Sequence, residues 1–101
     1  MRVAELKINA VAFQEGDAWV IQGIEYDIVA HTYKTAEVPH VFMRAVIENI
    51  LITEHMGRRP LEGIKRAPEH FRQLFDDAQT EMRPTKKDPR ADISVRVAEP
   101  A

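Results

Sequence analysis

The stretch that decides the fold is residues 35–57, which reads TAEVPHVFMRAVIENILITEHMG. Thr35 is a good N-cap, Glu37 suits the positive end of a helix dipole, and Gly57 is placed to end a helix. Between these signals, apolar residues recur at helical spacing in two neighbouring rows, with a polar stripe beside them. The rows are Val38, Phe42, Val46 and Ile50, then Met43, Ile47 and Leu51; the polar stripe is Glu37, His40, Arg44, Glu48 and His55.

This pattern predicts a helix over residues 36–56 with a broad apolar surface. Such a surface is wider than one sheet face covers, so part of it must meet a second element or another subunit. A domain of this size also has a modest core, which self-association would extend. We therefore expect the chain to form a homodimer or a higher oligomer.

Three strands are predicted before the helix, over residues 5–13, 18–24 and 28–34. The first alternates apolar and polar residues with period two, and the other two are rich in residues that favour strands. Gly16 can take the positive φ of a tight turn, and the short connections require an antiparallel meander. Gly23, inside the second strand, indicates a bulge or a close approach of the backbone.

After the helix, residues 58–67 read as a loop, and Pro68 opens a second helix that runs to about Met82. Residues 84–91 look like a flexible linker before a last strand over residues 92–98. That strand can pair within its own sheet or be exchanged with a second chain, and the sequence leaves both possibilities open. The second helix carries one narrow apolar stripe, formed by Phe71, Leu74, Phe75 and Ala78.

The predicted order is thus β-β-β-α-α-β in one domain over residues 1–101. An antiparallel meander sheet with both helices on one face buries all these stripes, which is a two-layer α+β architecture. A hydrophobic content of 45% and a charged content of 30% are ordinary for a globular domain.

Composition excludes several classes of site. The chain has no cysteine, so disulfides, thiolate zinc sites and cysteine nucleophiles are excluded. No apolar run reaches the ~18 residues that span a bilayer, and the first residues lack a signal-peptide pattern. We expect a cytoplasmic protein with no membrane association and no cofactor.

Charge is unevenly distributed along the chain. Residues 1–57 carry four basic and eight acidic side chains, a net charge of −4, whereas residues 58–101 carry ten and eight, a net charge of +2. Part of the basic excess lies in Arg58, Arg59, Lys65 and Arg66. One hypothesis is weak nucleic-acid binding there, with affinity falling steeply as salt rises; solvated loop charge is the other interpretation.

A family resemblance lies between Trp19 and Gly57. The segment Trp19-Val20-Ile21-Gln22-Gly23-Ile24 is followed by Glu25-Tyr26-Asp27-Ile28-Val29-Ala30, and then by Thr35-Ala36-Glu37 at the start of the helix. This sequence resembles the N-terminal domain of HicB-type antitoxins and their lone-domain relatives. The family pattern is a hairpin with Trp/Tyr-Val-x-x-Gly/Cys-Leu, a short turn, a third strand and a Thr-capped helix.

The resemblance implies a βββα core that oligomerises and masks a small ribonuclease toxin of the HicA kind. Three departures from the family are visible. The turn commonly written Leu-Pro-Gly-Cys is here Ile24-Glu25-Tyr26-Asp27, and the helix carries His40, Val41 and Phe42 where Glu and Ala are frequent. After the core the sequence predicts only the second helix and one strand, without a helix-turn-helix or ribbon-helix-helix pattern, and we therefore do not expect direct DNA binding. A solitary HicB-like protein of unassigned role remains an equal interpretation.

The alternative to an interaction module is a small hydrolase or a metal-binding protein. Glu25 and Asp27 lie two residues apart, so on an extended backbone they would share a face, and His31 follows on the next strand. No two of the four histidines have the spacing of a helical zinc site, and Ser94, the only serine, has no nucleophile elbow around it. We therefore predict no catalytic residue and no metal ligand. The candidate interface residues are Trp19, Phe42, Met43, Val46, Ile47, Ile50 and Leu51.

Overall fold

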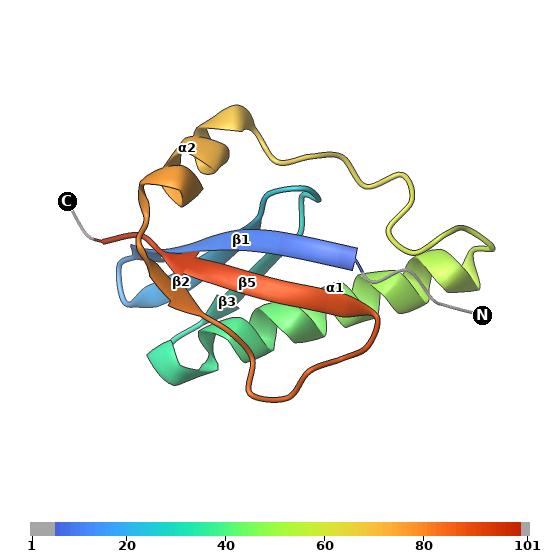
Figure 1. Ribbon diagram of the computed structural model, residues 1–101, viewed down its shortest axis with the longest axis horizontal. Helices are drawn as coiled ribbons and strands as arrows, with labels where there is room; N and C mark the ends of the chain where they lie inside the picture. The colour runs from blue at the N-terminus through green and yellow to red at the C-terminus, as the bar shows by residue number, and fades with distance from the viewer. Residues whose placement is uncertain (1–5, 100–101) are drawn as a thin grey trace.

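A computed structural model describes residues 6–99 of the chain (Figure 1). Within these residues, five strands and two α-helices form an α+β fold, with a short 3-10 turn before the first helix. The elements are β1 (Leu6–Glu15), β2 (Ala18–Gly23), β3 (Val29–Thr32), η1 (Thr35–Glu37), α1 (Val38–His55), α2 (Glu69–Asp77), β4 (Thr80–Met82) and β5 (Ala91–Val97).

The strands form one mixed sheet in the order β3-β2-β1-β5-β4. As predicted, β1, β2 and β3 make an antiparallel meander, in which Ala12 pairs with Ile21 and Ile21 with Ala30. The last long strand, β5, pairs with β1 of the same chain and runs parallel to it, with Ala10 opposite Val95. The sheet is therefore mixed and not a simple meander. The segment that contains both helices runs from the edge strand β3 to the opposite edge strand β4, and β5 then returns beside β1 and parallel to it.

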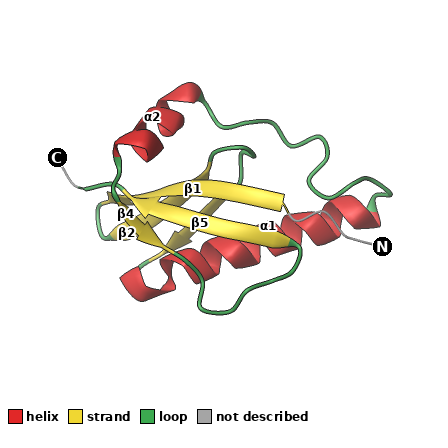
Figure 2. Cartoon of the chain, viewed as in Figure 1, coloured by secondary structure: helices red, strands yellow, loops and turns green. Residues whose placement is uncertain are grey.

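One face of the sheet is covered by α1 (Figure 2). Phe42, Val46 and Ile50 are fully buried there against small and branched residues of the strands. The prediction that Gly23 allows a close approach is confirmed. A Cβ at Gly23 would lie 2.6 Å from the carbonyl oxygen of Tyr26 and 3.1 Å from Cζ of Phe42. A side chain here would therefore meet first the backbone of the turn after β2 and then the Phe42 ring of α1.

The opposite face is covered in part by α2, so the prediction that both helices share one face is wrong. Val11 points to the other side of β1 from Ala10 and Ala12, and it packs with Ile24 and Phe75 in a second, smaller cluster. The Arg96 guanidinium lies 4.2 Å from the centre of the Phe75 ring and donates to the Phe75 carbonyl oxygen at 3.1 Å. The apolar stripe of α2 predicts that the helix packs on the sheet, but its residues do not specify which face of the sheet it covers.

Two predicted boundaries also change. The second helix ends at Asp77 and not at Met82, because Ala78 is extended and residues 80–82 pair with β5 as β4. Thr35 does not cap the main helix; its hydroxyl oxygen instead accepts a hydrogen bond from Nε1 of Trp19 at 3.0 Å. In both places a tertiary contact overrides the local signal.

Candidate interaction surface

The structure divides the predicted interface residues into two groups. Trp19 is buried, with its indole nitrogen bonded to Thr35, and the row Phe42, Val46 and Ile50 has no solvent exposure. These four side chains belong to the core of the chain itself, so a partner does not reach them in this fold. Their burial removes them from the candidate interface.

The second row of α1 runs from the core outward. Met43 and Ile47 are half-buried against the main cluster, whereas Leu51 is 52% exposed. Beyond it, Ile52 and Met56 are each 56% exposed, although neither was among the predicted interface residues. Figure 1 shows why: the last turns of α1 extend past the ends of β1 and β5, so no strand lies beneath them. The exposed apolar surface of α1 is therefore at the end of the helix and not along its whole length.

The loop after this helix end is firmly anchored. Oγ1 of Thr53 accepts a hydrogen bond at 2.9 Å from the amide of Leu61, whose side chain is fully buried in the main core. Leu61 has a φ of 64°, which is rare for a bulky residue. The Arg59 amide also donates to the Glu62 carboxylate at 3.1 Å. The loop thus has a defined shape, and Arg58 and Arg59 are exposed on it.

The weaker polar candidates do not converge. The Glu25 carboxylate accepts hydrogen bonds at 2.7 Å from both the backbone amide and the side-chain amide of Asn9. Asp27 accepts one at 2.8 Å from Nε2 of Gln22, so the two carboxylates are held by different partners. His31 is exposed on β3 and makes no side-chain hydrogen bond within residues 6–99. Both carboxylates secure the turn between β2 and β3.

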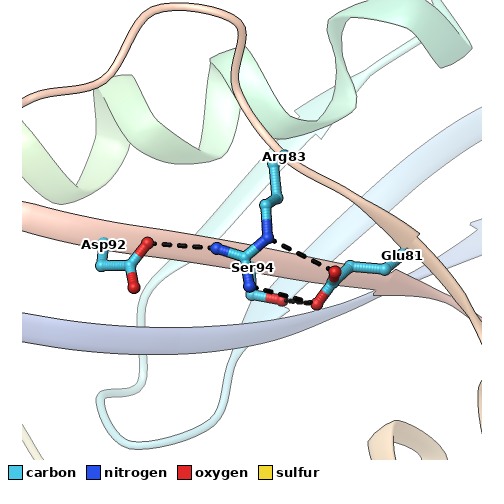
Figure 3. A network of polar contacts seen from close by, with 4 residues as sticks. All are labelled: Glu81, Arg83, Asp92 and Ser94. Atoms are coloured by element: carbon cyan, nitrogen blue, oxygen red, sulfur yellow. Dashed lines mark hydrogen bonds and ion pairs between the residues drawn. The ribbon is translucent and has the colours of Figure 1, made fainter.

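The sequence did not reveal a polar network across β4 and β5 (Figure 3). The Ser94 hydroxyl donates to the Glu81 carboxylate, and Arg83 forms ion pairs with Glu81 at 3.3 Å and Asp92 at 3.2 Å. The hydrogen bond from Ser94, assisted by the charge of Arg83, lowers the pKa of Glu81. The carboxylate accepts from the hydroxyl, and no histidine takes part in the network. The network joins the short edge strand β4 to its neighbour β5. Its signal was hidden because residues 80–82 read as the end of a helix.

The segment 84–91 connects β4 to β5 and is held at two points. Nε2 of His40 on α1 accepts a hydrogen bond at 3.3 Å from the amide of Thr85 and lies 3.0 Å from its hydroxyl. Arg90 pairs with Asp88 at 3.0 Å, and this contact lowers the pKa of Asp88. Next to this segment is a hollow of about 210 Å³ lined in part by Met43, Lys86 and Lys87.

A larger groove, of about 400 Å³, lies at the other end of the molecule from the exposed end of α1. The groove is lined by Leu74, Asp77, Ala78, Gln79, Ala98 and Glu99, of which the two acidic side chains are the only charged residues.

Among residues 6–99, no group of three histidine, aspartate or glutamate side chains is placed to hold a metal ion. No helix in that range is long and apolar enough to cross a membrane.

No family model, curated protein or solved structure matches this chain.

Proposed function

We propose that this chain is a HicB-like protein-interaction module, which self-associates and masks a small ribonuclease toxin without catalysing a reaction of its own. The observation that carries the proposal is the exposed end of α1. Leu51, Ile52 and Met56 are each more than half exposed on a helix whose earlier turns are well packed. Large apolar side chains gathered on one surface are typical of a site that another protein covers.

The energetics favour covering this surface. Full burial of a Leu, Ile or Met side chain contributes about 1.5–3 kcal/mol, and roughly half of that remains to be gained at each of the three positions. The gain is modest beside the entropy lost on association. The apolar surface alone therefore does not account for a stable complex, and polar contacts at its rim must supply the rest of the free energy of association.

The HicB-like assignment has separate support. An antiparallel hairpin, a third strand and a long helix follow one another from β1 to α1, as the resemblance implies. The non-catalytic part of the proposal is supported by the engagement of Glu25 and Asp27 in the turn. Neither carboxylate is paired with His31.

Light scattering coupled to size exclusion tests the self-association. We expect the wild type to exceed the monomer mass of 11.6 kDa at micromolar concentration. The double change Leu51→Ser and Ile52→Ser should raise the dissociation constant about tenfold, as the loss of ~1.4 kcal/mol predicts. Val29→Ser is the matched control, because Val29 is also an exposed aliphatic residue (42%) but lies on β3. A wild type that stays monomeric would contradict the proposal.

Toxin masking is tested with a purified HicA-like ribonuclease and a labelled RNA substrate. We expect RNA cleavage to fall as the wild-type chain is added, with a 50% point that moves to higher concentration for the Leu51→Ser and Ile52→Ser variant. Cleavage that is unchanged at a large excess of the chain would refute this part, while leaving self-association intact.

A further inference from the structure

The end of α1 and the loop after it form a surface that combines apolar and basic groups. Ile52 and Met56 supply the exposed apolar side chains, and Arg58 and Arg59 follow directly in the loop. Within residues 6–99 neither arginine enters an ion pair. We refer to these four residues as the basic tip.

The basic tip is rigid enough to act as a preformed contact. The Arg58 amide donates to the Thr53 carbonyl oxygen at 2.9 Å, and the neighbouring Gly57 amide donates to that of Glu54, also at 2.9 Å. Buried Leu61 then fixes the far side of the loop. Because the backbone is already ordered, docking of the arginines would cost less conformational entropy than docking from a free loop.

The groove at the opposite end has the complementary character. Asp77 and Glu99 lie in its lining, and neither carboxylate forms an ion pair within the described part of the chain. Leu74, also in the lining, is 38% exposed and offers an apolar contact. We refer to Leu74, Asp77 and Glu99 as the acidic groove.

We propose that the basic tip of one copy docks into the acidic groove of a second copy. This inference rests on the self-association in the proposed function and specifies which surfaces meet. Arg58 and Arg59 would lie against Asp77 and Glu99, where complementary charges set the orientation of the contact. The exposed side chains of Ile52 and Met56 would cover Leu74.

The assembly that follows is head-to-tail. The tip and the groove lie at opposite ends of a molecule that measures 44 Å along its longest axis, which is horizontal in Figure 1. A contact between two different surfaces is heterologous, so each docked pair leaves one tip and one groove unoccupied. Mean mass is therefore expected to keep rising with concentration and not to stop at the dimer.

A second copy fits the tip better than a nucleic acid does. Recognition of single-stranded nucleic acid relies on aromatic side chains on which bases stack, and the tip carries none. The exposed side chains of Ile52 and Met56 favour an apolar partner, and Leu74 of a second copy is such a partner. Both halves of the contact are thus present in one sequence.

Charge reversal tests the contact with the full-length chain. Two variants are needed: a tip variant, Arg58→Glu with Arg59→Glu, and a groove variant, Asp77→Lys with Glu99→Lys. Each alone should raise the dissociation constant for self-association at least about tenfold in low salt, as expected for repulsion between like charges at a docked contact. Lys86→Glu with Lys87→Glu is the matched control for the tip variant, since it makes the same change in net charge outside both surfaces and should leave association unchanged.

Mixing the two variants is the decisive step. A glutamate tip matches a lysine groove, and the arginine tip of the groove variant still matches the native groove of the tip variant. The equimolar mixture should therefore recover association to within about threefold of the wild-type dissociation constant, because every contact again joins opposite charges. Circular dichroism of each variant confirms that it is folded.

The possible outcomes separate the two proposals. If the wild type associates but neither charge variant weakens it, or the mixture recovers nothing, the tip-to-groove contact is wrong while self-association stands. If the wild type remains monomeric at several hundred micromolar, both are wrong. If the tip variant loses binding to a labelled RNA while wild-type self-association is absent, the tip serves a nucleic acid instead and the contact is overturned.

Discussion

The amide of Leu61 donates a hydrogen bond to Oγ1 of Thr53 over 2.9 Å, and this bond joins a strained loop residue to the last turns of α1. Thr53 also donates its own hydroxyl hydrogen toward the carbonyl oxygens of Asn49 and Ile50, both 3.0 Å away. The side chain is buried, so each of these groups has no access to water as an alternative partner. A single hydroxyl thus connects the helix, the loop and the core.

Removing that hydroxyl should destabilise the fold. Thr53→Val keeps the shape of the side chain but leaves the Leu61 amide without an acceptor, which we expect to lower the free energy of unfolding by about 1–3 kcal/mol. Thr53→Ser is the control, since it retains the oxygen and should cost less. Urea denaturation measures both. Equal stability of Thr53→Val and the wild type would show that the bond contributes nothing.

A side chain at Gly23 should be poorly tolerated. In Gly23→Ala, the new Cβ would lie 2.6 Å from a backbone oxygen that has no freedom to rotate away, and 3.1 Å from the Phe42 ring. We expect a loss of about 1–3 kcal/mol in unfolding free energy, the usual cost of overpacking a core. Gly16→Asn is the matched control, because Gly16 has open space around it and asparagine tolerates its φ of 61°. A Gly23→Ala protein as stable as the control would refute the close approach.

These cases show which parts of the fold were visible in the sequence. The helix α1 was predictable because its apolar row repeats every four residues, and Gly23 was recognisable because glycine is unusual inside a strand. The strand β4 was not, since three residues of mixed polarity, Thr80–Met82, cannot establish a period. The parallel pairing of β5 with β1 depends on how a long crossover packs, which is a tertiary property.

The candidate site was predictable to a similar extent. The sequence indicated that α1 has too much apolar surface for one sheet, and the exposure of Leu51 agrees with that. It did not reveal that the helix extends past the strands, where Ile52 and Met56 are exposed, or that Phe42 is buried in the core. The length of a helix relative to its sheet depends on where the strands end, and no residue of the helix encodes this. The polar network could not be predicted either, because Glu81 lies on β4, a strand that the sequence does not reveal.

The contribution of Glu81 should depend on pH. Its folded pKa is lowered, first by the Ser94 hydrogen bond, from the ordinary value of 4.5. A carboxylate with a lowered folded pKa stabilises the protein fully above its unfolded pKa, and this contribution is lost as pH falls through the folded pKa. Glu81→Gln should therefore be less stable than the wild type at neutral pH, and the difference should shrink in acid below pH 4.5.

The size of this effect is limited by exposure. The Glu81 side chain is 45% exposed, so the difference at neutral pH should stay below about 1 kcal/mol. Thermal unfolding at about pH 7 and about pH 3 measures it, with Glu99→Gln as a control outside the network. A destabilisation by Glu81→Gln that is constant across this range would contradict a role for the charged carboxylate.

The docking of α2 should depend on Arg96. Its guanidinium lies over the Phe75 ring and bonds to the Phe75 carbonyl oxygen, near the end of the helix. Arg96→Met keeps much of the apolar stem but removes both contacts, and we expect it to lower the free energy of unfolding by about 0.5–2 kcal/mol. Since the contact lies at α2, amide hydrogen exchange should increase more in α2 than in α1.

Arg72 provides the matched control for this prediction. It approaches the same ring at 6.0 Å and pairs with Asp76 at 3.6 Å, but its side chain is 42% exposed. An exposed pair of this kind contributes little, so Arg72→Met should change the free energy of unfolding by less than about 0.5 kcal/mol. If the two variants lose equal stability, or if exchange in α2 is unaffected by Arg96→Met, the contact over Phe75 does not hold the helix. A larger loss of stability in Arg96→Met than in Arg72→Met, with faster amide exchange confined to α2, would instead establish that Arg96 holds this helix. The helix lines one side of the acidic groove.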